Sequence, residues 1–94
     1  MKITLTKTFE KTIKKLHNNQ LKALEDAIDE IALTPTIGEA KKGDLAAVRV
    51  YKFRLHNQLM LVAYLYQKVV QEITLLSFSS HENFYRDLKQ SERK

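Results

Sequence analysis

The chain has 94 residues, which is enough for one domain and too few for two, because independent domains usually need on the order of 100 residues each. Hydrophobic residues make up 44% of the sequence, with two glycines and one proline, and this composition excludes a disordered or fibrous chain. The lack of cysteine excludes a disulfide scaffold, a thiol nucleophile and a thiolate metal site. The longest apolar run, residues 59–66, is too short to span a membrane, so we expect a cytoplasmic protein.

The net charge of +5 is distributed in blocks along the chain. Residues 1–22 and 41–68 are basic, whereas residues 25–39 carry only acidic charges. This pattern predicts surfaces of opposite sign, of which the basic ones would attract phosphate or an acidic protein. The alternative is a lysine-rich face that is simply solvated.

The first half of the chain predicts one strand and two helices. Residues 2–6 alternate as in a short strand, and apolar residues then recur at helical spacing over residues 8–16. A second helix, capped by Asn18 or Asn19, has an apolar stripe opposite an acidic face. It ends before Pro35, and the two helices are expected to form an antiparallel hairpin.

The second half predicts a loop over residues 36–44, an antiparallel meander and a short last helix. The expected strands span residues 45–55, 59–67 and 69–79, with turns at residues 56–58 and near residues 67–68. Ser79 and Glu82 have the spacing of a capping box, which would begin a helix that runs to about Gln90. The fold class is therefore α+β, in the order β-α-α-β-β-β-α, with an antiparallel sheet, an N-terminal helical hairpin and a C-terminal helix in a single domain over residues 1–94.

One candidate site lies on the strand after the loop. Alternation there places Tyr51, Phe53 and Leu55 on one face, and Lys52 and Arg54 on the other, about 7 Å apart along the strand. A phosphodiester fits between two such cations. The alternative is that the two charges are solvated and bind nothing.

The start of the last helix is the second candidate site. His81 and Glu82 lie in the first helical turn, where free amides and the helix dipole favour an anion. The imidazole could give or take a proton, whereas the carboxylate could instead serve the helix cap. Tyr85 and Arg86 could contact a base or a phosphate, or could lie on the surface without a ligand.

Neither a metal nor a cofactor is expected. His17, His56 and His81 lie in different segments, and none has the i, i+4 spacing that a helical metal site needs. No glycine-rich loop that could cradle a phosphate is present.

The ordered combination of segments resembles the RelE/ParE superfamily of toxins from bacterial type II toxin–antitoxin modules. The resemblance covers nearly the whole chain and rests on the element order and on these segments: the loop at residues 35–38, residues 43–45 leading into residues 49–55, the strand at residues 61–64, and residues 81–88 at the end.

The resemblance implies two possible activities and one partner. RelE-like members cut messenger RNA on the ribosome without a metal, by promoting attack of a ribose 2′-hydroxyl on the adjacent phosphate. ParE-like members share the fold but inhibit DNA gyrase without cutting nucleic acid. Both kinds are neutralised by a cognate antitoxin protein. We expect the first activity and keep the second as the alternative.

For the RNA-cleaving activity the resemblance also implies residue roles. Lys52 and Arg54 would stabilise the charge of the transition state, and His81, with Glu82, would transfer protons. The family pattern has a further arginine at the position of Leu61, which is a departure from that pattern.

Three further residues are expected to contact the RNA. They are Arg49, Tyr85 and Arg86, and no membrane partner is expected.

Overall fold

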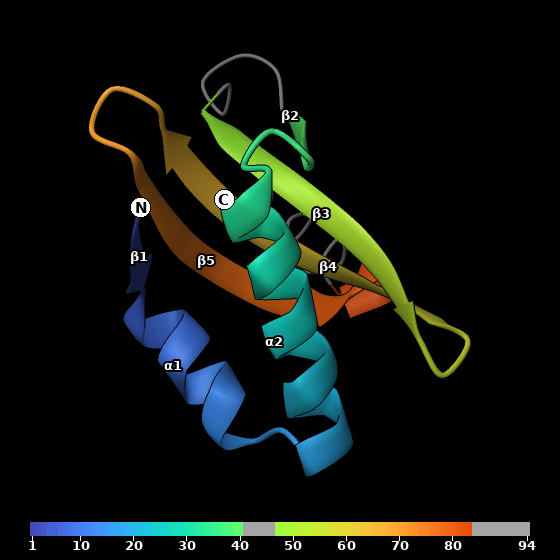
Figure 1. Ribbon diagram of the computed structural model, residues 1–94. Coiled ribbons are helices and arrows are strands. Elements are labelled where there is room, and N and C mark those ends of the chain that lie inside the picture. Colours follow the sequence, from blue (N-terminus) through green and yellow to red (C-terminus); the bar gives the residue numbers. More distant parts are fainter. Residues whose placement is uncertain (41–46, 84–94) are drawn as a thin grey trace, which may run out of the picture.

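The computed structural model describes residues 1–40 and 47–83 and confirms an α+β fold (Figure 1). The elements are β1 (Lys2–Leu5), α1 (Lys7–Lys14), α2 (Asn18–Leu33), β2 (Glu39–Ala40), β3 (Val48–Leu55), β4 (Gln58–Gln67) and β5 (Glu72–Ser80). None of the helices in these two ranges is both long and apolar enough to cross a membrane.

The sheet has five strands in the order β1-β5-β4-β3-β2 and is mixed rather than antiparallel. β2, β3, β4 and β5 pair antiparallel, but β1 runs parallel to β5, with Lys2 opposite Glu72 and Leu5 opposite Leu75. The expectation of an antiparallel sheet was wrong for β1, because no hairpin links this strand to its neighbour and alternation within a strand carries no information on its direction. The loop expected over residues 36–44 also contains the short strand β2.

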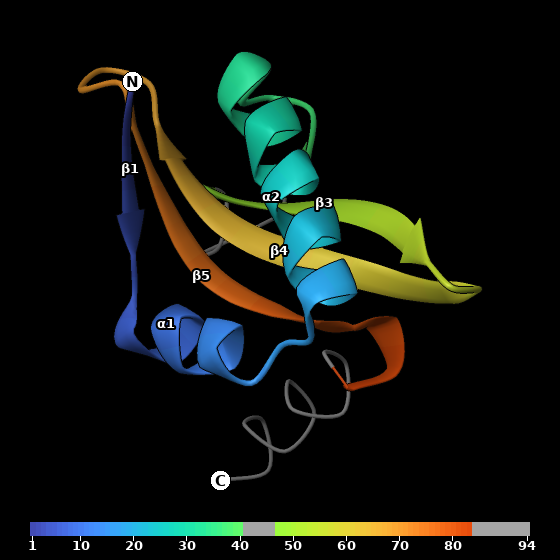
Figure 2. The same cartoon turned by 60° about the horizontal axis from the view of Figure 1, so that its bottom comes forward.

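Both helices lie on one face of the sheet and bury the main core against it (Figures 1 and 2). Phe9 from α1 and Leu24 and Ile31 from α2 pack in one cluster with Tyr64 and Leu75 of the sheet. Apolar side chains at helical spacing thus meet the apolar row of β4 and β5, which is the pattern that the sequence predicted.

The two helix starts are fixed by local hydrogen bonds. The Thr6 hydroxyl accepts a hydrogen bond from the Phe9 N–H (3.2 Å) and caps α1. At α2 the N-cap is His17 rather than Asn18 or Asn19, and its N–H donates to the Gln20 side chain (3.0 Å). The expectation was off by one position because the glutamine at the third helical residue satisfies the backbone in place of an asparagine cap.

Of the two turns that connect β3, β4 and β5, the first lies where it was predicted and the second is longer than predicted. His56 and Asn57 both have positive φ (50° and 66°) and form a tight turn where residues 56–58 were expected to turn. The β4–β5 turn is longer than expected, since β5 starts at Glu72 and Val69 lies in the turn with 97% of its surface exposed. Because Val69 and the residue after it are apolar, their pattern predicted a strand, and the start of β5 was placed too early.

At the end of β5, Ser80 rather than Ser79 caps the next helical turn. Its hydroxyl accepts a hydrogen bond from the Asn83 N–H (3.2 Å), and residues 81–83 are helical. The rest of the expected C-terminal helix, with the candidate residues Tyr85 and Arg86, lies outside the described residues.

Candidate functional site

The two cations predicted on β3 lie on the face of the sheet opposite the helices, which we call the distal face. Lys52 and Arg54 are exposed there, whereas Tyr51 and Phe53 pack against the core beneath α1 and α2. The rings of Tyr51 and Phe53 stack at 6.1 Å between centroids, which helps to fix the orientation of the strand. Lys52 and Arg54 therefore lie on the side of β3 opposite Tyr51 and Phe53.

Next to the cations the distal face is apolar. Val50, Leu61 and Ala63 are buried and pack with Leu76 in a second, smaller core cluster. Leu61 pairs with Lys52 on one side and with Ser79 on the other. Two strand spacings separate Lys52 from Ser79, so their Cα atoms lie about 10 Å apart across the leucine.

His81 lies at the same end of the sheet as these two cations. Arg54 pairs with Leu59 of β4, and β5 ends at Ser80, which pairs with the next β4 residue, Met60. His81 follows directly, is exposed and opens the helical turn. The ends of β3 and β5 lie on the same side of the sheet in Figure 1, so the register brings His81 to the level of Arg54. Glu82 is exposed beside His81.

Arg49 occupies a different position from the other candidate residues. It pairs with Tyr64 and so lies on the side of the sheet that carries the helices. Its guanidinium donates to the carbonyl of Gly38 (2.7 Å) and to that of Thr36 (3.3 Å). The structure thus places Arg49 against the loop after α2, not beside Lys52 and Arg54.

Tyr64 completes a contact that sequence reasoning missed, and we call Tyr64 and Arg49 together with residues 35–38 the loop anchor. The fully buried Tyr64 donates its hydroxyl hydrogen to the Pro35 carbonyl (2.6 Å) and accepts from the Gly38 N–H (2.9 Å). Burial raises the pKa of the Tyr64 hydroxyl, although the Gly38 amide and the Arg49 charge partly oppose this. A Cβ at Gly38 would lie 2.6 Å from the tyrosine oxygen, so only glycine fits without movement. The sequence carries no signal that singles out Tyr64, because the apolar run of β4 contains both Tyr64 and Tyr66.

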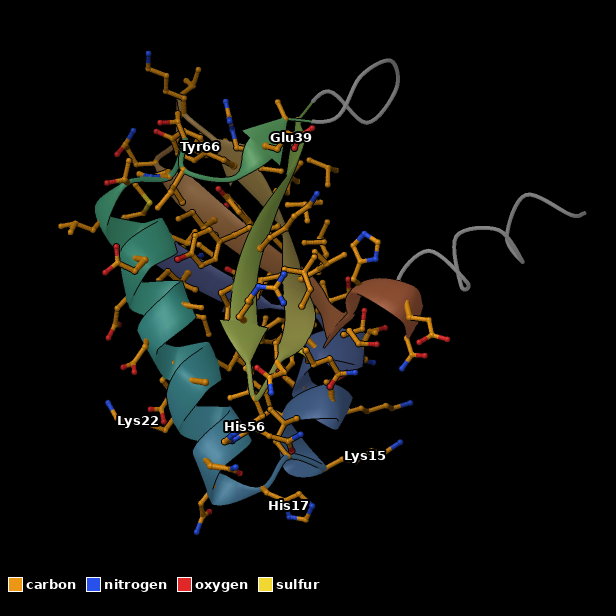
Figure 3. All side chains as sticks on the ribbon, turned by 90° about the vertical axis from the view of Figure 1, so that its right-hand side faces the viewer. Lys15, His17, Lys22, Glu39, His56 and Tyr66 are labelled. Atoms are coloured by element: carbon orange, nitrogen blue, oxygen red, sulfur yellow. The ribbon has the colours of Figure 1, made fainter. Side chains whose placement is uncertain are left out.

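No metal site is found in the described ranges. No group of three or more His, Cys, Asp or Glu there is arranged to hold an ion. His17 and His56 lie near the start of α2, as Figure 3 shows, and the His56 ring is within 3.0 Å of the Asn19 amide nitrogen. His17 therefore caps the start of α2, and His56 lies in the β3–β4 turn.

Solved structures with a similar fold include bacterial toxins, alone and in complex with antitoxins. The isolated RelE toxin from E. coli superimposes with a TM-score of 0.67 at 16% identity, covering 95% of this chain and 96% of that chain. The E. coli RelBE toxin–antitoxin complex gives 0.67 at 17%, covering 83% and 93%, and the RelBE2 complex from Mycobacterium tuberculosis gives 0.65 at 18%, covering 85% and 96%. No curated protein matches the sequence.

The match to a family model identifies the class of protein. The model of the ParE-like toxins of type II bacterial toxin–antitoxin systems matches residues 3–89. The chain therefore belongs to this family of toxins and has a RelE-like fold.

Proposed function

We propose that the chain is a toxin that cleaves messenger RNA on the ribosome in the cytoplasm and is neutralised by a cognate antitoxin, and that residues 1–94 form one toxin domain. Family membership supports the general role. The observation that carries the cleavage proposal is that Lys52 and Arg54 are exposed side by side on the distal face, at the end of the sheet where His81 begins a helix.

In this mechanism the two cations hold the scissile phosphate. The ribose 2′-oxygen attacks the adjacent phosphorus, the bond to the 5′-oxygen breaks, and the extra negative charge of the transition state is stabilised by Lys52 and Arg54. Loss of one well-placed charge-stabilising donor typically costs about 10²- to 10³-fold in rate. His81 accepts the proton of the 2′-hydroxyl or protonates the leaving oxygen, which is commonly worth about 10²- to 10⁴-fold, and Glu82 assists it.

A second candidate function is inhibition of DNA gyrase without cleavage. Two observations favour it: the matching family model is described as ParE-like, and Leu61, at the position of the further family arginine, is buried among apolar residues. In that case Lys52 and Arg54 would bind the target without chemistry.

The antitoxin proposal rests on family membership and on two structures of similar fold that are toxin–antitoxin complexes. The test is co-expression with the protein encoded beside the toxin. Growth should recover, and the two proteins should co-purify. Growth arrest that persists with the neighbouring protein at equal abundance would contradict this part of the proposal.

Induction from a tight promoter distinguishes the two activities. Cleavage predicts new transcript ends within coding regions, whereas gyrase inhibition predicts stalled supercoiling with intact transcripts. The variant Lys52→Ala/His81→Ala should abolish both growth arrest and transcript cleavage. Lys15→Ala is the matched control, because Lys15 is also exposed but lies at the end of α1 (Figure 3). Full transcript cleavage by the double variant would overturn the mechanism.

A further inference from the structure

β1 leaves one side of its backbone unpaired in the described sheet. It is an edge strand that pairs only with β5. The N–H groups of Lys2 and Thr6 donate to the carbonyls of Gln71 (3.1 Å), just before β5, and of Leu75 (3.2 Å) on β5. Because backbone groups point alternately to the two sides of a strand, the N–H and C=O groups of Ile3 and Leu5 point away from the sheet.

The same two residues carry incompletely buried apolar side chains. Ile3 and Leu5 lie on the face that bears the helices, opposite buried residues of β5, yet 39% and 38% of their surfaces are exposed. The β4–β5 turn, with Val69 and Val70 exposed, extends past β1 at this edge (Figures 1 and 2). Among the features that protect edge strands, β1 lacks proline, a bulge and an inward-pointing charge, and its protection is limited to its length of four residues and to Lys2.

We propose that β1 is a dimerisation edge at which a second copy of this chain adds its own β1 antiparallel, about a two-fold axis through Thr4. In this register Ile3 faces Leu5 of the second copy, and Leu5 faces Ile3. Both residues have outward N–H and C=O groups, so each of the two pairs exchanges two hydrogen bonds. The Ile3 and Leu5 side chains of both copies then lie on one face and cover one another.

The residue on the axis fits a symmetric contact. Thr4 is uncharged, its side chain points to the distal face, and its hydroxyl already donates to the Glu72 carboxylate (2.8 Å). No charge therefore faces its own copy at the axis, where like charges directly opposite each other are destabilising. An isologous interface of this kind closes as a dimer and leaves no free β1 edge.

Repulsion between the two positively charged copies opposes this dimer, so the effect of salt distinguishes it from a contact with an acidic partner. Each copy has a net charge of +5, and Lys2 and Lys7 flank the edge. Pairing held by backbone hydrogen bonds and apolar contact should strengthen as salt screens this repulsion, whereas a contact with an acidic partner should weaken. A four-residue strand buries less than a standard interface of about 1,600 Å², so the association should be weak.

Sedimentation equilibrium of the full chain, from micromolar to millimolar concentration at low and high salt, tests the proposal. We expect a monomer–dimer equilibrium that shifts toward dimer at high salt. Ile3→Pro blocks an outward amide, and Leu5→Lys keeps the backbone but adds a charge; each should weaken dimerisation at least about tenfold. Ile37→Lys is the matched control, since Ile37 is 41% exposed but lies in the loop after α2.

Amide hydrogen exchange gives a second readout at single residues. Exchange at the N–H groups of Ile3 and Leu5 should slow as protein concentration rises, while exchange at Thr6, which donates to Leu75, should stay the same. The proposal is overturned by a chain that stays monomeric at every concentration, by dimers that Leu5→Lys leaves intact, or by association that salt weakens.

Discussion

The loop anchor makes a sharp prediction about stability. Replacing Tyr64 by phenylalanine keeps the buried ring and removes only the hydroxyl. That hydroxyl donates to the Pro35 carbonyl (2.6 Å) and accepts from the Gly38 amide (2.9 Å). The variant therefore leaves one donor and one acceptor without their partner at a contact between β4 and the loop after α2.

The size of the effect follows from those two hydrogen bonds. Each contributes about 0.5–1.5 kcal/mol net, and a buried group left unsatisfied costs about 1–3 kcal/mol, so a loss of about 2 kcal/mol in the free energy of unfolding is expected. For a domain of this length, 1 kcal/mol corresponds to about 4–8 °C in Tm. Tyr64→Phe should therefore lower Tm by roughly 8–16 °C.

Thermal unfolding followed by circular dichroism measures this effect. Tyr66→Phe is the matched control: Tyr66 lies on the same strand and packs against the same core, but its hydroxyl makes no hydrogen bond to the described part of the chain. Gly38→Ala should also destabilise, by about 1–3 kcal/mol, because the added Cβ meets the Tyr64 ring. A Tyr64→Phe variant that melts within about one degree of the parent chain would refute the hydrogen-bond reasoning.

Four further outcomes are expected. Lys52→Ala and Arg54→Ala should each weaken growth arrest while leaving Tm unchanged, since both side chains are exposed. Arg49→Ala should instead lower Tm, because it removes donors to two loop carbonyls, with loss of about 1–3 kcal/mol measured by urea unfolding. Leu61→Arg should destabilise by about 3 kcal/mol or more, measured in the same way, because it places an unpaired charge among buried apolar residues. The raised pKa of Tyr64 stabilises the folded chain below the usual tyrosine pKa of about 10, and this contribution should be lost above that pH in the parent chain but not in Tyr64→Phe.

Patterns within single elements predicted most of the fold. The change from period 2 to helical spacing located β1, α1 and α2, and the alternation in β3 correctly separated Tyr51 and Phe53 from Lys52 and Arg54. These predictions succeed because one buried face imposes the period on the sequence.

The errors occurred where distant segments meet. The parallel pairing of β1 with β5 joins residues that are about 70 positions apart, and the two-residue β2 exists only because β3 offers an edge. Alternation places Arg49 on the side opposite Lys52, but the sequence gives no sign that its guanidinium reaches the carbonyl of Gly38. Hydrogen bonds to backbone groups in a loop leave no periodic pattern, so the loop anchor could be recognised only in three dimensions.

The distribution of charge on the distal face bears on which activity the toxin has. Leu61 is fully buried between Lys52 and Ser79, so near Leu61 the positive charge comes from β3, and the neighbouring β5 residue offers a hydroxyl group. Two cations on one strand are sufficient to bind a phosphate, and binding of this kind serves a nuclease and a gyrase inhibitor equally well. Proton transfer is the step that only the nuclease needs, and His81 is the residue to which the proposal assigns this step. His81→Ala should therefore keep target binding and lose transcript cleavage, as measured by mapping transcript ends. Growth arrest that is unchanged in this variant, with stalled supercoiling, would assign the toxin to gyrase inhibition.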